Sequence, residues 1–211
     1  MSDIELLFDG PEGERDARPV LVLAHGAGAG MRHPWMASMA GRLGDAGLRV
    51  ARFEFPYIAR KVEGGRAGRP DAERVLRATW IEVVDRLGGG SAVVVGGKSM
   101  GGRIASMIAD EVGARGLVCL GYPFHPAGRP ERLRTAHLEG LRTPALFVQG
   151  ARDALGSRAD VEGYALSPSI RLCWLEDGDH SFAPRKASGY TAAGHLDAAA
   201  AAVVDFVRGL A

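Results

Sequence analysis

Six short runs of apolar and β-branched residues recur along the chain, and they constrain its fold more than any other feature. Most of the runs are continuous and do not alternate with polar residues, which is typical of parallel strands buried on both faces of a sheet. Segments with helical spacing lie between them. This alternation predicts an α/β fold, a doubly wound and mostly parallel sheet with helices on both faces. The expected strands are Val20–Ala24, Leu48–Phe55, Ala92–Gly96, Gly116–Leu120, Ala145–Gln149 and Ile170–Leu175.

The intervening segments predict amphipathic helices. Trp35, Met39 and Leu43 fall on one helical face, and Pro34 suits the first turn of that helix. An additional edge strand is expected at Ile4–Phe8. The chain of 211 residues shows no internal repeat and no linker, so we expect one domain over residues 1–211. The other expected helices are Asp71–Leu87, Arg103–Val112, a short Glu131–Leu141 and Leu196–Leu210.

Composition excludes several classes of partner. The net charge is +1, with basic and acidic residues interspersed, which gives no reason to expect nucleic acid or a membrane surface as partner. Residues 1–5 carry no basic segment typical of a secretory signal, and no run approaches the roughly 18 apolar residues of a spanning helix. Cys119 and Cys173 lie inside strand-like runs, and we expect both side chains to be buried and reduced. We therefore expect a cytoplasmic protein that acts on a small molecule.

A G-x-S-x-G motif, Gly97–Gly101, places a serine at position 99. The motif alone is weak evidence in a glycine-rich chain, and a βα turn of no chemical use is the alternative. Its context strengthens it, because it directly follows the strand Ala92–Gly96 and precedes the helix Arg103–Val112. Strand, sharp turn and helix form the nucleophile elbow of serine hydrolases, which predicts Ser99 as a nucleophile.

A serine nucleophile needs a histidine base, and in this fold the base follows the nucleophile in the chain. His180 lies just past the last expected strand, at the carboxyl end of the sheet, where ligand sites of open α/β sheets form. His137 falls in an expected helix and His195 begins the C-terminal one, so each is interpreted as a solvated or capping residue. His180 is the predicted base.

The base needs an orienting acid between it and the nucleophile in sequence. Asp153 follows the strand Ala145–Gln149 through a short loop and reaches the same sheet edge. Asp179 is the alternative, although adjacent side chains rarely turn toward each other at hydrogen-bond distance. Asp153 is the predicted acid.

A second glycine-rich turn, His25–Gly30, follows the strand Val20–Ala24. Backbone amides that stabilise a tetrahedral oxyanion come from such a loop and from the residue after the nucleophile. This predicts Ala27 and Met100 as the oxyanion hole. A phosphate-binding loop is disfavoured, since the run lacks the P-loop ending and the dinucleotide spacing.

The surrounding pocket is predicted to include His25, His33, Tyr57 and Pro123. His25 is also expected to prop its loop by hydrogen bonding, and packing or capping roles stay open for His33 and Tyr57. The Gly- and Arg-rich stretch 60–70 is expected to be a mobile loop, either merely solvated or favouring anionic substrates. No cofactor is expected, and the scattered histidines and cysteines show no metal-ligand spacing. The basic residues of that loop are Arg60, Lys61, Arg66 and Arg69.

Taken together, several motifs resemble the dienelactone-hydrolase-like branch of the α/β-hydrolases. They are most similar to a group of small predicted serine hydrolases that includes a eukaryotic testis-expressed relative. The resemblance implies Ser99, Asp153 and His180 as triad, with Met100 and Ala27 at the oxyanion hole. It also implies the usual eight-stranded sheet, reduced at its N-terminal edge. The motifs are HGAGAGMRHPWM, FEFPY, GGKSMGGR, GYPFHP, FVQGARD and GDHSF.

In this family's strand order, the strand carrying Asp153 lies between those carrying Cys119 and Cys173. Only about twenty residues, Pro123–Thr143, separate the two strands between which many relatives insert a lid, so no cap domain is expected. The predicted function is a cofactor-independent serine hydrolase of a carboxylic ester or thioester. A peptidase of the same fold and a non-catalytic binding subunit stay open, as does the choice between monomer and homodimer.

Overall fold

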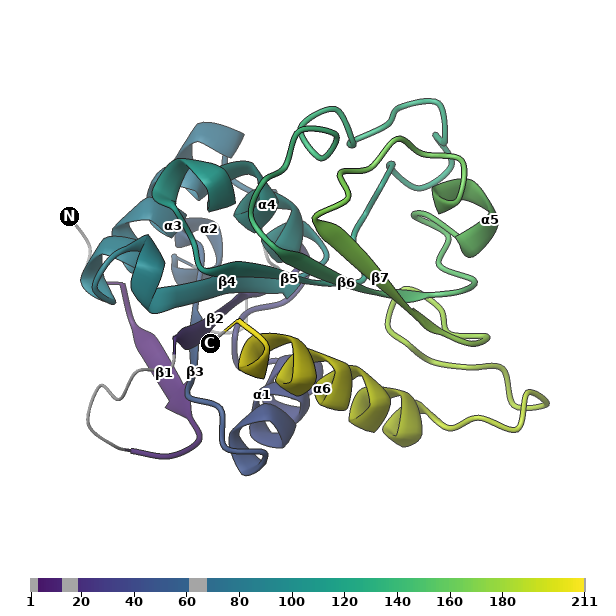
Figure 1. Cartoon of the computed structure of the whole chain (residues 1–211), viewed down its shortest axis with the longest axis horizontal. Coiled ribbons are helices and arrows are strands. Elements are labelled where there is room, and N and C mark those ends of the chain that lie inside the picture. The colour runs from purple at the N-terminus through teal and green to yellow at the C-terminus, as the bar shows by residue number, and fades with distance from the viewer. Residues whose placement is uncertain (1–3, 13–18, 61–67, 211) are drawn as a thin grey trace.

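The computed structural model of the chain describes residues 4–12, 19–60 and 68–210. In these ranges, seven strands form one sheet in the order β1-β3-β2-β4-β5-β6-β7 (Figure 1). β1 is antiparallel to β3, and every other pair is parallel. The strands are β1 (Leu6–Asp9), β2 (Val20–Ala24), β3 (Val50–Phe53), β4 (Val93–Lys98), β5 (Gly116–Leu120), β6 (Ala145–Gly150) and β7 (Ile170–Leu175).

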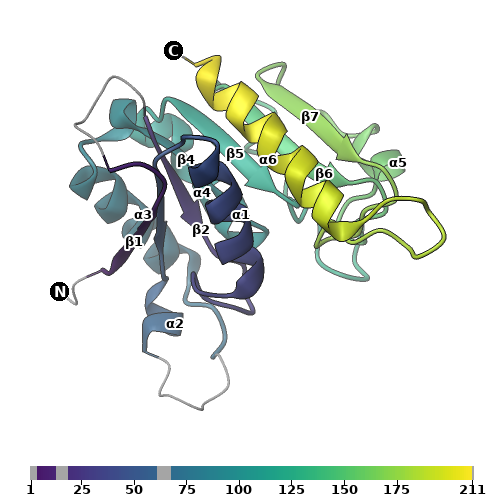
Figure 2. The ribbon, with the colours of Figure 1, turned by 90° about the horizontal axis from the view of Figure 1, so that it is seen from below.

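Helices cover both faces of this sheet. α1 and α6 lie side by side over one face, as Figure 2 shows from below, and α3 and α4 pack together over the other. The apolar interior is accordingly split into two clusters, one on each side of the sheet. None of the described helices has the length and apolar character to cross a bilayer. The helices are α1 (Pro34–Asp45), α2 (Pro56–Ala59), α3 (Glu73–Arg86), α4 (Met100–Val112), α5 (Arg158–Val161) and α6 (Ala192–Arg208), with a 3₁₀ turn at Gly90–Ala92.

The predicted α/β fold is confirmed, and most elements lie where the sequence places them. β2, β5 and β7 have the predicted bounds, and the extra edge strand forms as β1. The sheet has seven described strands, which agrees with an eight-stranded sheet reduced at its N-terminal edge. β6 lies between the cysteine strands β5 and β7, as expected, and both cysteines are free thiols.

The helix expected at Glu131–Leu141 does not form, and the segment consists of turns. Backbone groups of the segment form hydrogen bonds with residues outside it, in place of the bonds between residues i and i−4 that a helix requires. The Arg134 amide donates to the Phe124 carbonyl at 2.8 Å, and the Leu138 carbonyl accepts the Ser167 amide at 3.0 Å. Pro126 and Pro130 precede the segment, and proline inside a helix breaks its hydrogen bonding, so a helix that begins before residue 130 is also disfavoured. The link from β5 to β6 therefore has neither a crossover helix nor a lid.

Candidate active site

A sharp turn joins β4 to α4 and carries Ser99 between them. Ser99 has a φ of +51° and a ψ of −115°, a strained conformation that non-glycine residues adopt mainly at functional sites. The flanking glycines permit the turn because the end of β2 passes very close. A Cβ atom added at Gly97 or Gly101 would lie 2.2 or 2.3 Å from the Ala24 carbonyl oxygen. The serine is thereby held above the carboxyl end of the sheet.

Ser99, His180 and Asp153 form a continuous hydrogen-bonded chain. Ser99 Oγ lies 2.9 Å from His180 Nε2, and His180 Nδ1 lies 2.7 Å from Asp153 Oδ2. Because a carboxylate only accepts hydrogen bonds, Nδ1 carries a proton in this pairing and a neutral ring leaves Nε2 free to accept the serine proton. The structure thus brings together three residues that lie 27 to 81 positions apart in sequence.

Asp153 is completely buried, and both of its oxygens are engaged. Oδ2 also accepts from the Gln149 side-chain amide at 2.9 Å, and Oδ1 accepts from the Leu155 backbone amide at 2.8 Å. These bonds fix the carboxylate against the imidazole. Asp179, the alternative acid, accepts from the Ser181 and Ala183 amides within its own turn.

A buried lysine holds the loop that carries the histidine. Lys98 Nζ donates to the His180 carbonyl oxygen at 2.7 Å and lies over the Trp35 and Phe182 rings. Burial lowers the pKa of Lys98 to about 8, against the opposing influence of Asp153 and Asp179. Sequence reasoning missed this residue, although a lysine between an apolar strand and the nucleophile is itself an unusual signal.

His25 and Tyr57 support the glycine-rich loop after β2 by hydrogen bonds. His25 Nε2 accepts the Phe55 amide at 3.1 Å, and the Tyr57 hydroxyl donates to the Ala27 carbonyl at 2.9 Å. Burial lowers the pKa of His25 and is the main cause that raises the pKa of Tyr57 to about 12. Both side chains are buried and neither lines the cleft beside Ser99, so their expected place in the pocket is wrong. The supporting role expected for His25 is confirmed, because its Nδ1 also lies 2.7 Å from the Gly26 carbonyl oxygen.

His33 likewise lies outside the cleft. It is the N-cap of α1, and its Nδ1 accepts the Trp35 amide at 3.2 Å. Pro123, in contrast, lines the cleft as expected. Most of the predicted mobile loop, residues 61–67 with Lys61 and Arg66, lies outside the described residues.

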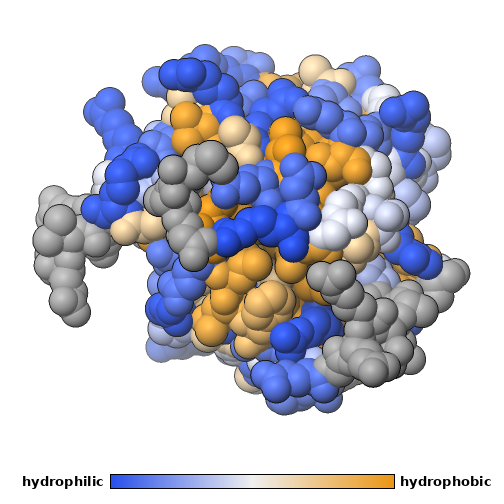
Figure 3. Space-filling view, turned by 90° about the vertical axis from the view of Figure 1, so that its left-hand side faces the viewer, coloured by the Kyte–Doolittle hydropathy of each residue, from blue (hydrophilic) through white to orange (hydrophobic). Residues whose placement is uncertain are grey.

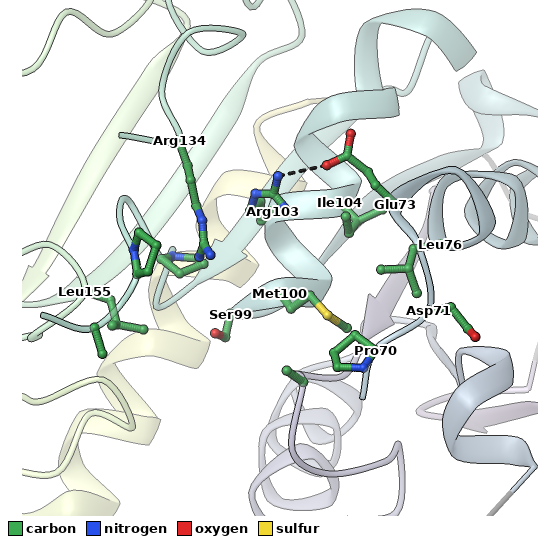
Figure 4. Close-up of a pocket in the computed structure, with 14 residues that line it drawn as sticks. Pro70, Asp71, Glu73, Leu76, Ser99, Met100, Arg103, Ile104, Arg134 and Leu155 are labelled. Carbon is green, nitrogen blue, oxygen red and sulfur yellow. Dashed lines mark hydrogen bonds and ion pairs between the residues drawn. The ribbon is translucent and has the colours of Figure 1, made fainter. Parts of the chain in front are cut away.

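The cleft beside Ser99 has a volume of about 440 Å³ (Figure 4). Both residues predicted for the oxyanion hole line it: Met100 at the start of α4, where amides lack intrahelical partners, and Ala27 on the exposed loop. Its walls are mainly apolar, with two arginines that sequence reasoning did not single out. The other lining residues are Pro70, Asp71, Glu73, Leu76, Arg103, Ile104, Pro123, Pro126, Ala127, Arg134 and Leu155.

Comparison with known proteins is consistent with this geometry. Residues 17–208 match a family model described as an alpha/beta hydrolase domain. The chain belongs to the α/β-hydrolase family. Within this family it falls in the dienelactone-hydrolase-like branch, as the motifs led us to expect.

Two curated relatives are each 30% identical to this chain over the aligned residues. Carboxymethylenebutenolidase of Pseudomonas putida is 30% identical over 46% of this chain and 40% of its own. A rat protein described as the putative protein-lysine deacylase ABHD14B is 30% identical over 66% of this chain and 63% of its own. The match therefore spans 40–63% of the length of these relatives.

Solved structures share the fold across almost the whole α/β hydrolase. Dienelactone hydrolase from Anabaena variabilis superposes with a TM-score of 0.67 at 21% identity, covering 98% of this chain and 91% of that one. XC6422 from Xanthomonas campestris, described as a serine hydrolase without lid, gives 0.63 at 19% identity, covering 98% and 88%. The lidless form of the fold agrees with the short link between β5 and β6.

Proposed function

We propose that this α/β hydrolase is a serine hydrolase that cleaves a carboxylic ester or thioester through an acyl-enzyme intermediate. The observation that carries the proposal is the chain of hydrogen bonds from Ser99 through His180 to Asp153. Its order, its distances and the buried acid at its end are those that nucleophilic acyl transfer requires.

In the proposed reaction Ser99 Oγ attacks the acyl carbon while its proton passes to His180 Nε2. The oxyanion that forms is stabilised by the amides of Met100 and Ala27. Collapse of this intermediate breaks the bond to the leaving alcohol or thiol, which takes the proton from His180. Water then attacks the acyl-serine and gives a proton to His180, which returns it to Ser99 as the carboxylic acid leaves.

Asp153 has an electrostatic and orienting role in this scheme. Its buried carboxylate holds the imidazole in the tautomer that presents Nε2 to the serine, and it stabilises the imidazolium formed on proton transfer. No step requires a cofactor. A cytoplasmic location and a small-molecule substrate belong to the same proposal.

Amide hydrolysis is the second candidate, and the relative described as a putative protein-lysine deacylase favours it. The same triad serves both bonds, and the difference lies in protonation of the leaving amine by His180. Kinetics with matched acyl esters and acyl-lysine amides separate the two. We place the ester first because carboxymethylenebutenolidase is named for a lactone, a cyclic ester.

Replacement of the nucleophile tests the proposal. Ser99→Ala is expected to lower kcat for 4-nitrophenyl butanoate by about 10⁴-fold or more, since the covalent route is lost. Ser91→Ala, an exposed serine before β4, is the matched control and should retain full activity. Comparable turnover by Ser99→Ala and the wild type would refute the assignment, provided thermal unfolding shows both folded.

A further inference from the structure

The cleft beside Ser99 contains one positive charge that no described acidic side chain neutralises. Arg134 lines the cleft, and Figure 4 shows its side chain extending toward Ser99 with Arg103 alongside. We propose that Arg134, supported by Arg103, forms a subsite for a carboxylate carried by the substrate. This inference rests on the proposed function and adds the substrate class: an ester or thioester with one negative charge near the scissile bond.

The backbone of Arg134 is fixed at both of its polar groups. Its amide donates to the Phe124 carbonyl at 2.8 Å, and its carbonyl accepts the hydroxyl of buried Tyr122 at 2.9 Å. The turn that replaces the expected helix is thus anchored at this residue. The fixed backbone holds the base of the Arg134 side chain in place, which reduces the freedom that is lost on binding.

Each of the other charged residues that line the cleft forms an ion pair, Asp71 with Arg60 from outside the lining. Arg103 Nη2 lies 2.9 Å from Glu73 Oε2, and Asp71 Oδ1 lies 2.6 Å from Arg60 Nη2. Within residues 4–12, 19–60 and 68–210, no carboxylate forms an ion pair with the Arg134 guanidinium. Arg134 is then the cleft-lining charge that no described ion pair engages.

That charge lies in an unfavourable environment in the free protein. Burial, as the larger cause, and the neighbouring Arg103 both lower the pKa of Arg134. Arg103 Nε is also buried without a hydrogen-bond partner. A bound carboxylate relieves the repulsion between the two guanidiniums and supplies an acceptor beside them.

The charge balance favours a carboxylate over a phosphate monoester. A single uncompensated guanidinium matches one negative charge, and its planar fork fits the two oxygens of a carboxylate. Among the described lining residues, no second unpaired cation is present to match another negative charge. The apolar wall formed by Met100, Ile104 and Leu155 accommodates the carbon skeleton.

Matched ester pairs test the subsite on either side of the scissile bond. For the leaving group the pair is 4-carboxyphenyl butanoate and 4-carbamoylphenyl butanoate. For the acyl group it is mono-4-nitrophenyl adipate and its methyl ester. The variants are Arg134→Gln and Arg134→Lys, and the matched control is Arg132→Gln, an exposed arginine two positions away that does not line the cleft.

We expect the wild type at low salt to favour the acid of at least one pair by about tenfold in kcat/KM. Arg134→Gln should bring that ratio close to one, chiefly by lowering kcat/KM for the acid. Arg134→Lys should keep part of the preference, and Arg132→Gln all of it. A wild-type ratio at or below one in both pairs, or a preference that survives Arg134→Gln, overturns the subsite. Absence of Ser99-dependent turnover of the neutral esters would instead refute the proposed function itself.

Discussion

At the scale of single residues, Lys98 links the proposed nucleophile to the proposed base. It directly precedes Ser99 on the chain, and its ammonium group donates to the backbone carbonyl of His180. Trp35 holds the same loop through an indole bond of 3.1 Å to the Ser181 carbonyl. The Trp35 and Phe182 rings beneath the ammonium offset part of the cost of burying it. The position of His180 therefore depends on a charge that the proposed chemistry does not consume.

The lowered pKa of Lys98 makes a prediction for stability. Its pKa is about 8 in the folded protein and about 10.4 in an unfolded chain, so between these pH values the unfolded state binds more protons. In this window the contribution of Lys98 to the free energy of unfolding rises with pH, by roughly 1–3 kcal/mol across it. Well below pH 8 Lys98 is protonated in both states and its contribution is constant.

Urea unfolding of the wild type and Lys98→Met at pH 7.5, 9 and 10 measures this term. The difference in unfolding free energy, wild type minus variant, is expected to grow as the pH rises. Groups that titrate in both proteins change both unfolding free energies equally, so their effect cancels in this difference. A difference that stays flat or shrinks over this range would contradict a buried, charge-destabilised lysine.

At the scale of elements, the link between β5 and β6 is where sequence and structure differ most. The segment Glu131–Leu141 forms turns in place of the expected helix, and of its leucines Leu133 is half-exposed whereas Leu138 and Leu141 are buried. Propensity and spacing report local preference, whereas these turns are fixed by bonds to α4 and to the segment before β7. The absence of a lid was predictable from the length of this link. The placement of Arg134 was not, because it depends on the bonds of its backbone to Phe124 and Tyr122.

This lidless link predicts a preference for short acyl chains. The described cleft of about 440 Å³ is open and has no cap, so each methylene beyond its apolar wall stays in water and gains none of the roughly 0.8 kcal/mol of burial. A series of 4-nitrophenyl esters from acetate to dodecanoate measures kcat/KM against chain length. We expect a maximum among the short chains; a maximum at about ten carbons or longer would indicate a deep enclosed pocket.

At the scale of the whole molecule, the parallel sheet assembles the site. Ser99, Asp153 and His180 follow β4, β6 and β7, and the glycine-rich loop follows β2, so all four segments meet at the carboxyl edge. This convergence was predictable from the sequence because strand ends and chain order locate these residues without any knowledge of packing. The supporting role of His25 was also predictable, whereas that of Tyr57 required the three-dimensional path of the loop, since the sequence does not show which side of the loop faces the solvent.

Covalent labelling of Ser99 tests the central claim most directly. A fluorophosphonate reacts only with a serine activated by a neighbouring base, and trypsin cleavage after Lys98 and Arg103 releases the labelled serine in the five-residue peptide Ser99–Arg103. We predict one adduct per chain, located on this peptide, and its loss in His180→Gln. A folded protein that takes up no label, or takes it up at another serine, would contradict the account.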